Sequence, residues 1–238
     1  MTEASDPARG LDFLVTGTDT GVGKTVVAAA LILALREAGV RALGFKPVES
    51  GLGEGEPADS EVLRAASGVD EPLARPLLRL PEPLAPAVAA ERAGEALDPG
   101  AVEERVRALR ACADGVVVEG AGGLLVPLAW GYTALDLAER MGLLAVVVAR
   151  TGLGTINHTL LTVEALRRRR VGVHAVVLNG RGAPPDLAES TNPDALERLL
   201  PGVPLVVLSR EAAATSTLEV ARAATASLRP LLPPRLLR

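Results

Sequence analysis

The chain has 238 residues, of which 48% are hydrophobic and 23% charged, and its formal net charge is −4. This composition excludes an intrinsically disordered chain and argues against a binder of polyanions. Aromatic residues make up only 2% of the chain, too few for the stacking platforms that bind single-stranded nucleic acid. The length fits one α/β domain over residues 1–238, and we expect residues 1–10 to be flexible.

Neither a secretory signal nor a membrane span is visible in the sequence. The longest apolar stretch, Val26–Leu35, is about half as long as a membrane-spanning helix requires. The single cysteine, Cys112, cannot form an internal disulfide, which suits a reducing compartment. The basic run 167–170 closes a predicted helix, where cations are favoured. We therefore expect a cytoplasmic protein with no membrane or nucleic-acid partner.

Apolar runs of strand length alternate with longer helical stretches along the chain. The runs are continuous in Val, Leu and Ala, as in parallel strands that are buried on both faces. We predict a doubly wound α/β fold, with a mostly parallel sheet and helices on both faces, of the P-loop NTPase type. The predicted strands are 11–16, 42–46, 115–119, 143–149, 173–179 and 204–208. The predicted helices are 24–38, 59–67, 99–112, 133–141, 155–170, 193–200 and 216–228.

The first predicted strand leads into a glycine-rich loop, Gly17-Thr-Asp-Thr-Gly-Val-Gly-Lys-Thr25. Its outer glycines are separated by five residues instead of the usual four, which is typical of one branch of P-loop proteins. Such a loop holds phosphate with backbone N–H groups, while the lysine reaches the β- and γ-phosphates and the hydroxyl binds Mg²⁺. The residues expected to contact a nucleoside triphosphate here are Thr20, Gly21, Val22, Gly23, Lys24, Thr25 and Val26.

Lys24 and Lys46 are the only two lysines among 25 basic residues. Lys46 ends the second predicted strand, in Phe45-Lys-Pro-Val-Glu-Ser-Gly51, at the same edge of the sheet as the glycine loop. A compact ammonium can enter a tight phosphate site that a broad guanidinium does not fit. We expect both ammonium groups to converge on one terminal phosphate, and Ser50 to contact the substrate.

Residues 71–99 interrupt the alternation with six prolines and room for one short helix at 86–93. A proline-rich segment of this length inside a compact domain is usually functional or a linker. We expect this proline-rich excursion to cover a site.

Two carboxylates are candidates for binding Mg²⁺. Glu119 ends the third predicted strand, where P-loop proteins carry an acidic residue near the metal. Asp59 begins a predicted helix and fits an N-cap as well as it fits a metal ligand. Asp19 adds a carboxylate beside the expected triphosphate and needs Mg²⁺ or a cationic substrate group nearby. The glycine-rich segment after Glu119 lets the backbone approach phosphate or substrate closely. Its residues expected to make such contacts are Gly120, Ala121 and Gly122.

The segment Leu153-Gly-Thr-Ile-Asn-His158 follows the fourth predicted strand and opens a helix. The free N–H groups of a helix start make a natural anion site. His158 has no evident partner, so we expect it to face solvent or to be satisfied locally. His174, inside a strand, is expected to be structural.

Four motifs in this order resemble the dethiobiotin synthetase family. The similarity spans residues 11–180, and residues 83–90 are similar to the family's substrate-side loop. The resemblance implies ATP-dependent carboxylation and ring closure of 7,8-diaminononanoate with CO2 in biotin biosynthesis, through a carbamate and a carbamic–phosphoric anhydride. The motifs are Val15–Thr25, Lys46–Gly51, Val118–Gly123 and Leu153–His158.

The resemblance also implies roles for individual residues. ATP and Mg²⁺ would be the cofactors, with the catalytic electrostatics at Lys24 and Lys46. In the family the contact with the carboxylate of the substrate crosses a dimer interface, so the resemblance implies a homodimer. The metal would be served by Thr25, Asp59 and Glu119; the diamine substrate by Thr20, Ser50, Gly122, Gly154 and Asn157; and the adenine base by Asn179 and Gly180.

Two other classes of protein remain as alternatives. An amidoligase that resembles cobyrinic acid diamide synthases would carry a glutaminase domain with a cysteine nucleophile, which helical Cys112 does not match. A switch ATPase of the septum-positioning type would bind a membrane through a C-terminal amphipathic helix. Residues 228–238 are basic and apolar, but Pro230, Pro233 and Pro234 interrupt a helix there.

Overall fold

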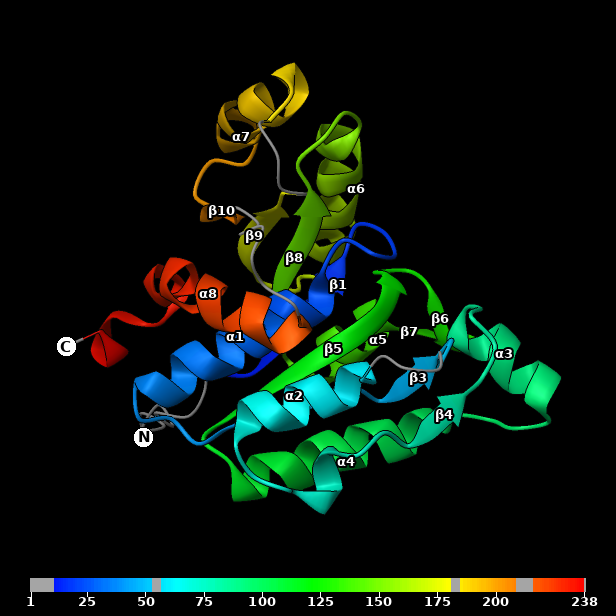
Figure 1. The fold of residues 1–238 in the computed structure, drawn as a ribbon. Coiled ribbons are helices and arrows are strands. Elements are labelled where there is room, and N and C mark those ends of the chain that lie inside the picture. Colours follow the sequence, from blue (N-terminus) through cyan, green and yellow to red (C-terminus); the bar gives the residue numbers. More distant parts are fainter. Residues whose placement is uncertain (1–10, 53–56, 181–184, 209–215, 238) are drawn as a thin grey trace, which may run out of the picture.

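The computed structural model describes residues 11–52, 57–180, 185–208 and 216–237; the predicted flexible start, residues 1–10, lies outside them. A six-stranded sheet runs through the described chain in the order β10-β9-β8-β1-β5-β2. All neighbouring strands in it are parallel (Figure 1). The strands are β1 (Phe13–Gly17), β2 (Ala42–Phe45), β5 (Gly115–Gly123), β8 (Leu144–Arg150), β9 (Val173–Asn179) and β10 (Leu205–Leu208).

Helices cover both faces of the sheet, which confirms the predicted doubly wound fold. Successive strand residues point to opposite faces, so Phe13 and Val15 pack in one core and Leu14 in the other. The first core is closed by α1 (Lys24–Glu37), α2 (Asp59–Ser67) and α8 (Thr217–Leu228). The second is closed by α3 (Pro86–Ala93), α4 (Pro99–Cys112), α5 (Ala134–Met141), α6 (Thr155–Arg168) and α7 (Leu187–Leu199).

The predicted helix 193–200 is wrong at its start, because α7 begins at Leu187. Pro193 suggested a first helical position, a place that proline favours. The structure instead places it inside the helix, which starts with a capping box between Asp186 and Glu189. That pair of side chains satisfies backbone N–H groups at the helix start. The spacing of Asp186 and Glu189 in the sequence is therefore the feature that indicates where α7 begins.

The proline-rich excursion 71–99 carries more structure than predicted. Besides the predicted helix α3, it contains a 3₁₀ turn (Pro72–Ala74) and the strand β4 (Leu78–Leu80). β4 pairs in parallel with β3 (Val48–Ser50), just after Lys46. The excursion is therefore fixed to the rim of the main sheet. A second small ladder, β6 (Pro127–Ala129) with β7 (Tyr132–Thr133), follows β5.

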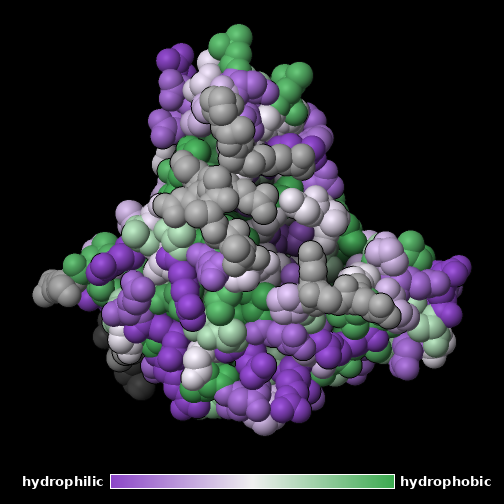
Figure 2. Space-filling view, in the orientation of Figure 1, coloured by the Kyte–Doolittle hydropathy of each residue, from purple (hydrophilic) through white to green (hydrophobic). Residues whose placement is uncertain are grey.

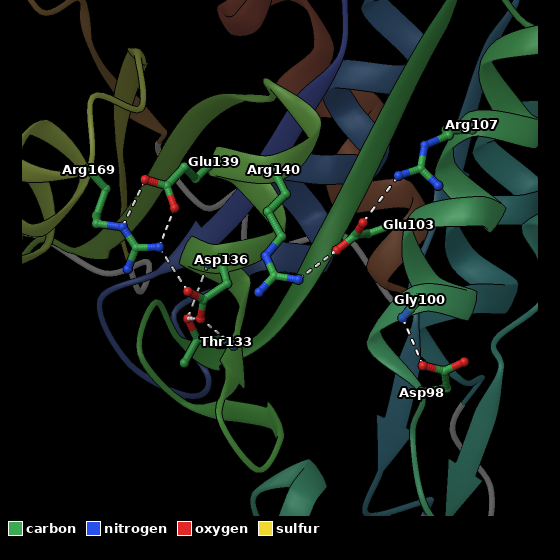
Figure 3. Close-up of polar contacts among 9 residues, drawn as sticks. All are labelled: Asp98, Gly100, Glu103, Arg107, Thr133, Asp136, Glu139, Arg140 and Arg169. Carbon is green, nitrogen blue, oxygen red and sulfur yellow. Dashed lines mark hydrogen bonds and ion pairs between the residues drawn. The ribbon is translucent and has the colours of Figure 1, made fainter.

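Polar contacts at the surface join the helices of the second face (Figure 3). Glu103 of α4 accepts hydrogen bonds from Arg107, in the same helix, and from Arg140 of α5, both at 3.2 Å. Arg169, just after α6, donates to Asp136 of α5 at 3.0 Å. These contacts link three consecutive helices around the edge of their apolar core.

After α8 the chain continues in two 3₁₀ turns, Arg229–Leu231 and Pro234–Leu236. The prolines thus end the helix, as predicted from the sequence. Within the described residues, no helix is long and apolar enough to cross a bilayer. The face seen in Figure 2 is mainly hydrophilic, with apolar residues in separate small groups.

Candidate active site

The glycine loop connects β1 to α1 as predicted. The N–H of Thr18 donates to the carbonyl of Val148 at 2.9 Å, which ties the loop to β8. Gly23 is the N-cap of α1 with φ of +95°, and no side chain caps the helix. The first N–H groups of α1 are therefore available to an anion, and the positive end of the helix dipole points to the same place.

A cavity of ≈690 Å³ opens at the carboxyl ends of β1, β2 and β5. Most of the residues that the sequence singled out line it. They come from the glycine loop, the segment after β2, the start of α2 and the glycines of β5. These residues are Thr20, Gly21, Gly23, Lys24, Thr25, Val26, Lys46, Ser50, Asp59, Glu119, Ala121 and Gly122.

Both lysines lie in this cavity and are almost fully buried, with exposures of 7% for Lys24 and 6% for Lys46. The Lys46 ammonium donates to Oε1 of Glu119 at 2.9 Å and forms an ion pair with Asp59. The Lys24 ammonium donates to the carbonyl of Asp19, in its own loop, at 3.2 Å. The structure thus brings together the two ammonium groups that the sequence predicted to converge.

Lys46 and Asp59 stabilise each other's charged form, whereas burial dominates at Lys24 and Glu119. Burial alone would lower the pKa of Lys46, but the carboxylates of Glu119 and Asp59 raise that pKa above its ordinary value. Lys46 therefore stays an ammonium. Burial alone would raise the pKa of Asp59, but the Lys46 ammonium outweighs burial and holds that pKa below its ordinary value. For Lys24, burial is the larger effect and lowers its pKa; for Glu119, burial raises the pKa.

The residues predicted to bind the metal also meet. The Thr25 hydroxyl lies 2.8 Å from Oδ1 of Asp59 and 3.0 Å from Oε1 of Glu119. Oε2 of Glu119 is buried and has no hydrogen-bond partner. A buried carboxylate oxygen without a partner is costly, and oxygen ligands are those that Mg²⁺ prefers. These three residues therefore fit Mg²⁺.

The two alternatives for Asp59 are separated by its backbone position. The N-cap of α2 is Ala58, which has no side-chain oxygen to cap the helix, so Asp59 is not the N-cap. Asp59 instead directs its carboxylate to Thr25 and Lys46. No cluster of three or more His, Cys, Asp or Glu side chains suited to a metal occurs in the described part of the chain. Two carboxylates and a hydroxyl suit an ion that keeps waters and phosphate oxygens as its other ligands.

The cation that Asp19 requires is Arg150, at the end of β8, which forms an ion pair with it. Asp19 also accepts a hydrogen bond from the N–H of Thr20 at 2.8 Å. The extra loop carboxylate is thus neutralised from a neighbouring strand. The sequence predicted the need for a cation, with Mg²⁺ or a substrate group as its source, whereas the structure provides an arginine.

Several predicted residues lie outside the cavity lining. Val22 is buried behind the loop, and its carbonyl accepts a hydrogen bond from the Asn179 amide at 2.9 Å. Gly154, with φ of +91°, is the N-cap of α6, and Asn157 is exposed on that helix. Neither reaches this cavity within one chain. Gly120 is buried in β5, and the N–H of Gly180 bonds to the carbonyl of Leu208 at 3.0 Å.

The structure adds residues that the sequence did not single out. Val48, Val126 and Thr217 line the cavity, and Thr217 comes from α8 near the far end of the chain. Residues 83–86 of the proline-rich excursion form another wall, where Ser50 donates to the carbonyl of Leu84 at 2.8 Å. The excursion thus borders this cavity, whereas the contribution of α8 had no local signal in the sequence.

A second cavity, of ≈510 Å³, lies beside α2. Charged side chains such as Arg64, Asp70, Arg75 and Arg79 line it. Neither the glycine loop nor a lysine reaches it, so the residues capable of phosphate chemistry are in the larger cavity.

Comparison with known proteins gives consistent results. A family model described as an AAA domain matches residues 12–215. The chain is 52% identical to the ATP-dependent dethiobiotin synthetase BioD of Anaeromyxobacter dehalogenans (strain 2CP-C), over 85% of this chain and 91% of that protein. It is 47% identical to the protein of the same name from Mycobacterium marinum (strain ATCC BAA-535 / M), over 79% and 82% of the two chains.

Solved structures share the fold at low sequence identity. The septum site-determining protein MinD from Pyrococcus horikoshii OT3, complexed with Mg-ADP, has a TM-score of 0.56 at 18% identity, over 92% of this chain and 94% of that one. A ParA family ATPase from Chlorobium tepidum TLS has a TM-score of 0.53 at 15% identity, over 92% of both chains. At such identities the likeness concerns the fold alone.

Proposed function

The chain belongs to the ATP-dependent dethiobiotin synthetase family, and we propose that it makes dethiobiotin from 7,8-diaminononanoate, CO2 and ATP. One amine takes up CO2 as a carbamate, whose oxygen attacks the γ-phosphorus of ATP and releases ADP. The second amine then attacks the carbonyl carbon of the resulting carbamic–phosphoric anhydride. This step releases phosphate and closes the cyclic urea.

The observation that carries the proposal is the burial of two ammonium groups in one cavity with the triad Thr25, Asp59 and Glu119. A carbamate and a triphosphate are both anionic and repel each other. Their in-line reaction therefore needs fixed positive charge around the transferred phosphoryl group. Lys24 and Lys46 supply such charge without having to reorganise.

We assign the nucleotide end of the cavity to ATP. The loop N–H groups and the start of α1 hold its phosphates, Lys24 reaches the terminal phosphates, and Lys46 faces the phosphoryl group and its acceptor. Thr25, Asp59 and Glu119 would hold Mg²⁺, which when bound adds positive charge to the phosphate oxygens. The remaining proposed nucleotide contacts are Thr20, Gly21, Val22, Gly23, Val26, Gly120, Ala121, Gly122, Asn179 and Gly180.

We assign the diamine to the same cavity. Thr20, Ser50 and Gly122 line it, as do residues 83–86 of the proline-rich excursion. These groups orient the amines and exclude water from the reactive anhydride. The substrate carboxylate is assigned to Gly154 and Asn157, at the uncapped start of α6.

A homodimer would complete this site, because Gly154 and Asn157 do not reach the cavity of their own chain. Leu153, just before α6, is 88% exposed, and Leu161, within α6, is 61% exposed. Exposed apolar side chains that gather on one surface commonly mark interfaces. We infer that a second copy of the chain covers α6 and that each cavity receives the start of α6 from its partner. We also propose that the enzyme works in the cytoplasm.

The mass of the product tests the proposed reaction. Purified protein is incubated with 7,8-diaminononanoate, ¹³C-labelled bicarbonate, ATP and Mg²⁺. We expect dethiobiotin that carries one ¹³C atom, with formation of one ADP per ring closed. Rapid ATP hydrolysis in the absence of the diamine, with no labelled product, would contradict the proposal.

Complementation tests the shared site. Asn157→Ala and Lys46→Met variants should each have little activity, but their mixture should regain part of it after subunit exchange. In a dimer with shared sites, one of the two sites then has both residues intact. No recovery in mixtures that have demonstrably exchanged subunits would contradict a site built from two chains.

A further inference from the structure

Glu49, at the centre of β3, is a buried carboxylate that does not line the active-site cavity. Its exposure is only 2%. A buried carboxylate is unfavourable unless it is paired and hydrogen-bonded. Glu49 has two partners: its Oε2 accepts from Nε of Arg79 at 3.0 Å, and its Oε1 accepts from the N–H of Ser60 at 2.7 Å. Arg79 is directly opposite Glu49 in the ladder between β3 and β4.

The contact with Ser60 replaces the missing cap of α2. The first N–H groups of a helix have no partner within the helix, and Ala58, the N-cap, has no side-chain oxygen to offer. Glu49 supplies that oxygen from a different element of the fold. Its negative charge also suits the positive end of the helix dipole.

Ser60 directly follows Asp59, whose carboxylate contacts Thr25 at 2.8 Å and forms the ion pair with Lys46. The peptide unit between Asp59 and Ser60 is therefore held from two sides. Glu49 holds its N–H, and the Thr25–Lys46 cluster holds the Asp59 side chain. Movement of the helix start would shift Asp59 relative to both partners.

We propose that Glu49 is a positioning residue that sets the Asp59 carboxylate for the metal and Lys46. Through Arg79, it also connects this carboxylate to the proline-rich excursion, whose residues 83–86 line the same cavity. The proposal rests on the proposed function, because it concerns the carboxylate assigned there to Mg²⁺. Groups that orient metal ligands without touching the metal commonly change metal affinity by about 10–100-fold.

Calorimetric titration of ATP at a series of Mg²⁺ concentrations tests the proposal without relying on turnover. For Glu49→Ala, we expect the Mg²⁺ concentration that half-maximally strengthens ATP binding to rise about tenfold. ATP binding in the absence of Mg²⁺ should change little. Glu61→Gln is the matched control: Glu61 lies in the same helix turn and 3.7 Å from Arg79, but is exposed, and the variant should match the wild type.

Two conservative variants separate positioning from simple stabilisation. Glu49→Gln keeps an oxygen within reach of Ser60 and should retain the wild-type Mg²⁺ dependence, even if its loss of charge beside Arg79 lowers the melting temperature. Glu49→Asp keeps the charge but withdraws it by one methylene, so its Mg²⁺ dependence should shift toward that of Glu49→Ala. This pair of variants decides the matter if Glu49→Ala does not fold.

Wild-type Mg²⁺ dependence in both Glu49→Asp and Glu49→Ala, with only lower melting temperatures, would overturn the proposal. Asp59→Asn separates this outcome from failure of the proposed function. If Asp59→Asn weakens Mg²⁺-dependent ATP binding while the Glu49 variants do not, the metal assignment stands and the positioning role falls. If Asp59→Asn has no effect either, the metal assignment itself falls.

Discussion

The Lys46 ammonium lies between Glu119 and Asp59, the two carboxylates that also contact the Thr25 hydroxyl. These residues come from the end of β2, from β5 and from the starts of α2 and α1. The arrangement places one fixed cation against the two carboxylates assigned to the metal. Charge at the position that we assign to the γ-phosphate is thus set by four separate segments of the chain before any substrate binds.

Replacing Lys46 with Arg should lower the turnover number about a hundredfold or more, the scale seen when one preorganised donor is lost. The planar guanidinium is too broad for a site in which Lys46 is 94% buried between two carboxylates. ATP affinity should remain nearly unchanged, because we assign most phosphate contacts to the loop and to Lys24. Steady-state kinetics and ATP titration measure the two quantities. Unchanged turnover would remove Lys46 from the mechanism.

Gly23→Ala should abolish ATP binding. A Cβ at this position would lie 2.0 Å from Nδ2 of Asn179, which is far inside van der Waals contact. Either the loop or the end of β9 has to move. Adding Asn179→Ala should recover part of the binding by relieving the clash, and fluorescence titration with a labelled ATP measures both variants.

Gly39→Ala is the control for backbone strain, because Gly39 has a similar φ of +82° and open space around its Cβ position. It should cost about 1–2 kcal/mol of stability and leave ATP binding intact. If Gly23→Ala and Gly39→Ala lose ATP binding to the same extent, general destabilisation explains the loss and the steric explanation is wrong.

The parts of the fold that could be predicted are those with a local signal. The α1, α2, α3 and α4 helices have the predicted bounds within one residue, because apolar runs, glycines and prolines mark them. The strand before the glycine loop, β1, begins two residues later than predicted. Both lysines follow parallel strands whose carboxyl ends share one edge of the sheet: Lys24 after the glycine loop that continues β1, and Lys46 directly after β2. This shared edge made it possible to predict that they lie in one site. Contacts between distant segments had no such signal: Arg150 with Asp19, Asn179 with Val22, and Thr217 at the cavity.

Arg110→Ala should lower the free energy of unfolding by about 1.5–3 kcal/mol, the range for hydrogen bonds to charged groups. Its guanidinium donates to Asp12 and to the carbonyl of Met141, both at 2.7 Å, and so joins α4 to the sheet and to the end of α5. Arg168→Ala is the matched control, because its pair with Glu164 is exposed; it should cost less than about 0.5 kcal/mol. Urea denaturation compares the two, and equal losses would contradict the role assigned to Arg110.

His174 should make the protein sensitive to acid. Its Nε2 lies 2.7 Å from the carbonyl of Leu231, which can only accept, so Nε2 carries the proton of the neutral ring. Burial lowers the pKa of His174 below its ordinary value of 6.5. The unfolded chain therefore takes up a proton at higher pH than the folded chain does. The stability due to this group is complete above pH 6.5 and is lost as the pH falls from there toward the lowered folded pKa.

His174→Gln keeps a donor for the Leu231 carbonyl and removes the titration. Between pH 7.5 and 5.5, the wild type should lose more stability than this variant, as measured by urea midpoints at each pH. His158→Gln removes the exposed histidine of α6 and should retain the acid sensitivity of the wild type. The buried surroundings of the ring also include Phe13, at 4.8 Å between ring centroids. If His174→Gln and the wild type lose the same stability over this range, burial does not lower the pKa of His174 and the prediction is wrong.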